Sequence, residues 1–179
     1  GHADGLLNDE GRRQAARLGR SVPPLDALYA SPLLRAADTA RAIAEVQSLE
    51  VEIDPGLKEI GFGAWEGMSP AEIEVAFPDE YRTFRQGVDL PRGGSGETFA
   101  GVQERMVDSV NSIVAANPGN TIGVVSHGGA TRAYVTDNLG IPSEKRSLIG
   151  GMGNTHYGRL AFTQRGPTVV SWNLAPHLA

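Results

Sequence analysis

The stretch that most constrains the fold runs from Asn120 to Arg132 and reads NTIGVVSHGGATR. Its first half is rich in β-branched residues and lies between turn-forming residues, which is typical of a strand buried on both faces of a parallel sheet. Its second half predicts a helix over 130–139 that stops at Gly140. The sequence therefore predicts a strand, a glycine pair and a helix in succession, as found in α/β domains.

The residues Ser126-His127-Gly128-Gly129 lie where this strand ends and the helix begins. Open α/β sheets bind ligands at the carboxyl ends of their strands, and the N–H groups at a helix N-terminus favour anions. One interpretation is that His127 faces a phosphate there. The alternative is that the glycines only permit a tight turn with positive φ and that the histidine is structural.

Composition limits the classes of protein to which the chain belongs. Its 179 residues, 40% hydrophobic and 21% charged, fit one globular domain with a sizeable core. No apolar run reaches membrane-spanning length and no signal peptide opens the sequence, so no membrane partner is expected. The absence of cysteine excludes thiolate nucleophiles and is compatible with the cytoplasmic location that we expect. A net charge of −5 disfavours nucleic-acid partners.

Arg35 is a second candidate. A short strand over 27–30 leads through Ser31-Pro32-Leu33-Leu34 into a helix that reaches about Val46, which places Arg35 in the first turn of that helix. A cation is unfavourable at a helix N-terminus, so this arginine is better explained if an anion also lies there. The alternative is a surface arginine held by Asp38 or Thr39.

Two acids, Glu59 and Glu66, lie in a glycine-punctuated loop over 57–67. Their neighbours include Trp65 and other apolar side chains, and a carboxyl near aromatic surface can have its pKa raised and serve as a general acid. The alternative is that both acids are solvated and that Trp65 belongs to the core.

The rest of the chain alternates helices with short strands, which indicates a three-layer α/β/α sandwich with a mostly parallel sheet and helices on both faces. Helices are expected after the N-caps Asn8 and Ser69 and over 79–86 and 97–116, and a hairpin over 155–173 with its turn at 164–167. The loop over 89–96 is interpreted as a lid or specificity loop. Residues 1–179 are therefore treated as one domain.

Several common sites are excluded, because the sequence has no nucleophile elbow, no P-loop and no dinucleotide-binding glycine spacing. In order along the chain, the remaining motifs resemble those of the histidine phosphatase superfamily, also called the phosphoglycerate mutase-like family. The similar stretches are ADGLLNDEGRRQA (3–15), SPLLRAADTA (31–40), LKEI with GAWEG (57–67), GET to Arg105 (96–105) and VSHGG (125–129). The resemblance covers nearly the whole chain.

One part of the family pattern does not occur in these residues. The family's nucleophile is a histidine in an Arg-His-Gly motif at the end of the first strand, and none of the four histidines can replace it. His2 lies in the loop that follows the nucleophile, His127 matches the family's second histidine, and His156 and His177 lie outside the motifs. Deleting a central strand beside the one that ends at His127 would expose unpaired backbone and apolar helix faces. We therefore expect the protein to contain this segment.

The resemblance implies a two-step phosphoryl transfer through a phosphohistidine. In it, Glu59 and His127 are catalytic, Arg35 and Gly128 bind the substrate phosphate, and Glu66 is structural. Because cationic side chains supply the positive charge, neither a metal nor another cofactor is expected.

The segment from Glu66 to Gly96 is shorter than the basic insertions of cofactor-dependent mutases, which favours a phosphatase acting on a small phosphorylated metabolite. The alternatives are such a phosphoglycerate mutase, or a catalytically inactive phosphate-ligand binding protein if the nucleophile is truly absent. Arg82, Arg85 and Arg92 lie in the family's variable region, where they either meet a second anionic group or remain solvated. Because dimers are common among such proteins, a homodimer is a further expectation.

Overall fold

A computed structural model describes residues 1–3, 5–164 and 166–178. Its centre is a parallel sheet of β1 (Ala27–Ala30), β2 (Glu52–Ile53) and β3 (Ile122–Val125), in the order β2-β1-β3. Tyr29 in the middle strand lies opposite both Glu52 and Val124. The parallel sheet predicted from the sequence is thereby confirmed.

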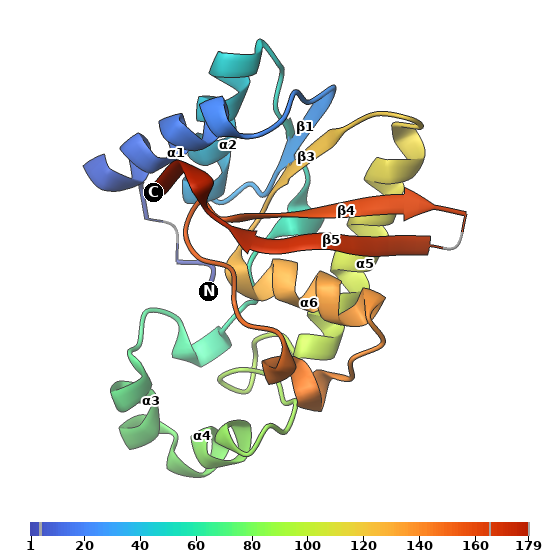
Figure 1. The fold of residues 1–179 in the computed structure, drawn as a ribbon. Coiled ribbons are helices and arrows are strands. Elements are labelled where there is room, and N and C mark those ends of the chain that lie inside the picture. The colour runs from blue at the N-terminus through green and yellow to red at the C-terminus, as the bar shows by residue number, and fades with distance from the viewer. Residues whose placement is uncertain (4, 165, 179) are drawn as a thin grey trace.

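Helices cover both faces of this sheet (Figure 1). They are α1 (Asp9–Ser21) and α2 (Leu34–Gln47) on one face, and α5 (Phe99–Ala116) and α6 (Gly128–Asn138) on the other. Side chains of β1 alternate between two cores, since Leu28 and Ala30 pack with α1 and α2 while Tyr29 packs against the α5–α6 cluster. The three-layer architecture is confirmed.

Local capping signals set the helix starts. The Asn8 side chain accepts a hydrogen bond from the Gly11 N–H, and Ser69 forms a capping box with Glu72. The long helix begins two residues later than expected because Thr98 caps it. The remaining helices are α3 (Pro70–Ala76), α4 (Pro78–Arg85) and the 3₁₀ turns η1 (Pro55–Leu57), η2 (Gly63–Trp65), η3 (Ser143–Leu148) and η4 (Pro176–Leu178). None of the described helices is long and apolar enough to cross a membrane.

The C-terminal part forms the predicted hairpin as a separate antiparallel sheet of β4 (Tyr157–Thr163) and β5 (Gly166–Leu174). Position 165 of the predicted turn lies outside the described residues. Among the described residues the strand before His127 is not buried on both faces, because Val124 is 37% exposed. Within the described residues β3 pairs with β1 alone and is an edge strand, so a neighbouring strand does not shield its other side.

Candidate active site

The site forms where β1 and β3 end side by side. The Ser31 N–H donates to the Val125 carbonyl oxygen at 2.9 Å, which joins the first residue after β1 to the last residue of β3. Directly beyond, the His127 Nε2 lies 2.8 Å from the Ser31 Oγ, and both side chains are buried. The helices α2 and α6 start at the same place, so the predicted location of the site at the strand ends follows from the topology.

His127 is neutral at physiological pH. Burial, followed by the positive charge of Arg35, lowers the pKa of His127 from 6.5 to about 3. The Ser31 Oγ also accepts the Leu33 N–H, and the direction of its bond with the His127 Nε2 depends on the tautomer of the imidazole. A neutral imidazole has one N–H donor and one acceptor nitrogen, so His127 can take part in one bond of each kind. This contact of Ser31 was not apparent from the sequence, because the two residues are 96 positions apart.

Arg35 lies in the first turn of α2, as expected, but neither of its expected neighbours holds its side chain. Asp38 pairs with Arg41, and the Thr39 hydroxyl binds the backbone carbonyl of Arg35. Instead the two Nη atoms of Arg35 donate to the carbonyl oxygens of Ala3 and Gly1, at 2.9 and 2.8 Å. Both acceptors are uncharged, so these bonds leave the positive charge of the guanidinium uncancelled.

Glu59 is bound to the N-terminus of α6. Its carboxylate accepts the N–H groups of Gly129 at 3.1 Å and Ala130 at 2.9 Å, and also that of Ile60 at 2.9 Å. The alternative that Glu59 is a solvated loop acid is therefore wrong. The helix end that was expected to attract an anion holds an internal carboxylate, next to His127.

Glu66 has a structural place, as predicted. Its carboxylate accepts the N–H groups of His2 at 2.7 Å and Phe62 at 2.8 Å. Burial opposes ionisation, but these backbone donors outweigh it and lower the pKa of Glu66. Trp65 is 3% exposed and belongs to the core.

The glycine pair at 128 and 129 lets neighbouring atoms approach the backbone closely, and it does not adopt a left-handed backbone conformation. Neither Gly128 nor Gly129 has a positive φ, so the tight-turn explanation is wrong for both. A Cβ at Gly129 would lie 2.5 Å from the Glu59 Oε1, and one at Gly128 would lie 3.1 Å from the Met152 carbonyl oxygen. The Gly128 N–H forms no hydrogen bond with the described residues.

An ion pair fixes the loop that carries Glu59. The Arg105 guanidinium binds the Glu97 carboxylate at 2.7 Å and also donates to the backbone carbonyls of Lys58 and Glu59, at 2.9 and 3.0 Å. Glu97 in turn accepts the Gly61 N–H at 2.7 Å. Both ionic residues lay in a recognised motif, but the sequence alone did not reveal this bracing role.

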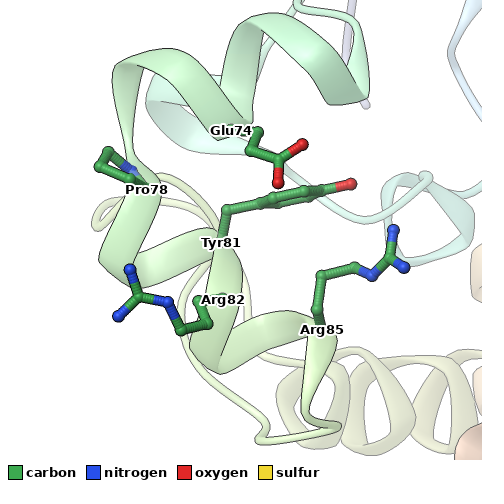
Figure 2. A pocket seen from close by; sticks show the side chains of 5 residues that line it. All are labelled: Glu74, Pro78, Tyr81, Arg82 and Arg85. Carbon is green, nitrogen blue, oxygen red and sulfur yellow. The ribbon is translucent and has the colours of Figure 1, made fainter.

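The three arginines of the variable region do not converge on one site. Arg92 is 2% exposed and pairs with Asp89 at 3.0 Å. The loop over 89–96 is therefore packed around Arg92, and the interpretation that Arg92 is a solvated surface arginine is wrong. Arg82 and Arg85 line a pocket of α3 and α4 with Glu74, Pro78 and Tyr81. Figure 2 shows these two arginines extending from α4 in different directions.

Residues with metal-binding chemistry are scattered. Within the described ranges, no group of three or more His, Asp and Glu side chains is placed to hold a metal ion. His156 binds the Asn173 side chain at 2.7 Å, and His177 lies 3.0 Å from the Thr155 hydroxyl. Neither histidine contributes to the site around His127.

Comparison with known proteins gives the class. Residues 1–175 match the model of the histidine phosphatase superfamily (branch 1). A glucosyl-3-phosphoglycerate phosphatase of Mycolicibacterium vanbaalenii is 33% identical over 90% of this chain and 75% of its own. A metal-independent phosphoserine phosphatase of Arabidopsis thaliana is 35% identical over 100% of this chain and 75% of its own.

A solved structure extends the likeness to three dimensions. The phosphoserine phosphatase of Entamoeba histolytica, as a histidine-to-alanine variant in complex with phosphoserine, superposes with a TM-score of 0.89 at 29% identity, covering 100% of this chain and 89% of that one. The chain therefore belongs to the histidine phosphatase superfamily. It is a phosphatase, as its motifs predicted.

Proposed function

We propose that the protein hydrolyses small phosphorylated metabolites through a phosphohistidine, with Arg35, His127 and Gly128 holding the phosphoryl group and Glu59 moving the proton. The observation that carries this proposal is that side chains from distant parts of the chain meet at one place. Three elements far apart in sequence bring a cation, an imidazole and a carboxylate to the joined ends of β1 and β3. The relatives' names, which refer to phosphoserine and glucosyl-3-phosphoglycerate, support a small phosphomonoester as substrate.

The donors suit an anion with three equatorial oxygens. Arg35 has a planar guanidinium whose present acceptors are neutral carbonyls, which a phosphate dianion can displace or supplement. The Gly128 N–H and the N–H of the neutral His127 ring are further donors at the same strand ends. Because these groups are fixed before the substrate arrives, they stabilise the charge that spreads over the phosphoryl oxygens in the transition state.

Glu59 is the proposed proton carrier. In the first step a histidine nitrogen forms a bond to phosphorus, the ester P–O bond breaks, and the protonated Glu59 gives its proton to the leaving oxygen. In the second step a water attacks phosphorus, the N–P bond breaks, and Glu59 takes the proton from that water. Inorganic phosphate leaves and both side chains return to their starting states.

We further propose that the nucleophilic histidine lies on a strand that pairs with the open edge of β3. Among the described strands β3 has one partner, and the β4–β5 hairpin forms a sheet of its own. The remaining described histidine near the site, His2, already uses its Nε2 in a bond to the Glu59 carbonyl oxygen at 2.7 Å. The intact mass of the protein tests this proposal, since an added strand requires a value above 18.9 kDa.

Phosphate release tests the function. Full-length protein in buffer with a metal chelator is expected to release inorganic phosphate from phosphoserine and from p-nitrophenyl phosphate, and a brief alkaline quench is expected to trap a labelled phosphohistidine. Turnover that requires a bisphosphate cofactor would indicate a mutase instead. Phosphate binding without turnover would indicate a binding protein and contradict the proposal.

The cytoplasmic location and the homodimer stay predictions. Cell fractionation tests the location. Light scattering of the purified protein distinguishes a dimer from a monomer.

A further inference from the structure

Arg132 lies on α6 close to the proposed active site. It follows Gly129 by three residues and Gly128 by four, so the three share one side of the helix. Side chains of a helix lean toward its N-terminus, which directs Arg132 back over the turn where Glu59 is bound. The negative charge of Glu59 acts on Arg132, yet the described residues form no ion pair of 4.0 Å or less with it.

Arg132 differs from the two arginines beside it because no hydrogen-bond acceptor for it lies among the described residues. Its Nε is buried and lacks a partner among the described residues, and the side chain is only partly exposed. Arg146, by contrast, donates to the carbonyl oxygens of Gly87 and Ser143, at 2.9 and 2.8 Å. Arg92 is paired with Asp89. Buried charged groups in proteins are usually paired, so Arg132 is the one that calls for an outside acceptor.

The surroundings of Arg132 are rich in positive charge. Arg132 and Arg146 lie over the ring of Phe99, with their guanidinium carbons 5.8 and 5.7 Å from its centroid. Arg146 and Arg92 lie over the ring of Phe84, at 5.4 and 5.3 Å. Burial lowers the pKa of Arg132, Glu59 opposes this, and the charge of Arg92 lowers it further. An anion bound at Arg132 would relieve this repulsion.

We propose that Arg132 binds the carboxylate of the substrate and thereby selects phosphomonoesters that carry a carboxylate a few bonds from the phosphate. This inference rests on the proposed function, because it assumes that the phosphate lies at Gly128 and His127. Four residues of an α-helix rise about 6 Å, so Gly128 and Arg132 can contact the two ends of a three-carbon phosphorylated acid. The flat guanidinium matches both carboxylate oxygens.

Calorimetry with two ligands that cannot be hydrolysed tests the proposal directly. One is the phosphonate analogue of phosphoserine, and the other is the same phosphonate without its carboxylate. Wild-type protein is expected to bind the first at least about tenfold more tightly, as one charge-assisted contact provides. Arg132→Gln is expected to reduce this preference to near one by weakening the first ligand alone, and Arg132→Lys to restore part of it.

Arg82→Gln is the matched control, because it removes the same charge from an exposed arginine that lines the α3–α4 pocket (Figure 2). It should keep the wild-type preference. An equal carboxylate preference in wild-type protein and Arg132→Gln would overturn the proposal, as would an equal loss of affinity for both ligands, which would assign Arg132 to the phosphate or to Glu59. Turnover of p-nitrophenyl phosphate, which has no carboxylate, reports separately on the proposed function. Thermal unfolding shows that each variant is folded.

Discussion

The site around His127 and the pocket between α3 and α4 both place arginines near a carboxyl group, but they are built in different ways. Arg82, which lines the pocket, pairs with Asp79, an exposed residue three positions away on the same helix. At the site, the contacts of Arg35, Glu59 and His127 join residues 32 to 96 positions apart. Charged groups with local partners are common on a helix surface, whereas long-range polar contacts converging at strand ends mark a site that the whole fold builds.

The largest expected effect of this difference concerns His127. His127→Ala should reduce kcat for p-nitrophenyl phosphate by roughly 10³-fold, because a positioned phosphate donor is lost. Arg82→Ala in the pocket should leave kcat within about twofold. If His127→Ala kept most of the activity, the strand ends would no longer be the site.

Arg35→Ala should reduce kcat/KM by roughly 10²-fold, with KM and kcat both affected, since the guanidinium is proposed to bind the phosphate before and during transfer. The control is Arg41→Ala on the same helix, where an exposed ion pair with Asp38 is lost. Steady-state kinetics with phosphoserine separates the two parameters. Similar losses in both variants would indicate a general effect of charge rather than a phosphate contact.

Glu59→Gln should slow turnover according to the leaving group. Phosphoserine releases a poor leaving group that needs a proton, so its kcat should fall by roughly 10²-fold, while p-nitrophenyl phosphate should be spared. Glu74→Gln, in the pocket, should affect neither substrate. An equal loss on both substrates would reject the role of Glu59 as proton donor.

The buried imidazole should also appear in the pH dependence of stability. Because the pKa of His127 is about 3 when folded and 6.5 when exposed, the unfolded chain binds a proton that the folded chain does not. Stability is thus lost as the pH falls below 6.5, by about 2 kcal/mol between pH 7 and pH 5. Urea unfolding of wild-type protein and His127→Gln at both pH values measures this, and the variant should lose less. A parallel pH dependence would mean that His127 binds a proton as readily in the folded state as in the unfolded state.

The smallest expected effect belongs to the pocket itself. Arg82→Ala removes an exposed pair and should change the free energy of unfolding by less than about 0.5 kcal/mol. Chemical denaturation at low and high salt measures it. A larger loss of unfolding free energy would show that the ion pairs within α4 contribute substantially to the stability of the fold.

Signals that act over a few residues allowed much of the fold to be predicted. Asn8 and Ser69 cap helices because their acceptors reach N–H groups three residues ahead, and such contacts can be read from the sequence. The exposure of Val124 could not be read in this way, because it depends on which strand lies beside β3.

The candidate site was predictable in its members but not in its contacts. The motifs pointed to Arg35, Glu59 and His127, and the structure brings all three to one place. The bond from Glu59 to the start of α6 spans 70 positions, and nothing local indicates it. Ser31 and Arg132 were not assigned a role from the sequence. Ser31 matters because it contacts His127, 96 positions away, and Arg132 matters because its Nε has no partner among the described residues.

The bond between Glu59 and the first turn of α6 couples a proton to the stability of a helix end. A charged carboxylate accepts N–H bonds more strongly than a neutral carboxyl does. In the proposed first step Glu59 starts protonated and ends charged, so the cap of α6 strengthens as the leaving group departs. The water attack reverses this change. In the proposed mechanism, each catalytic cycle therefore tightens and then relaxes the turn that follows His127.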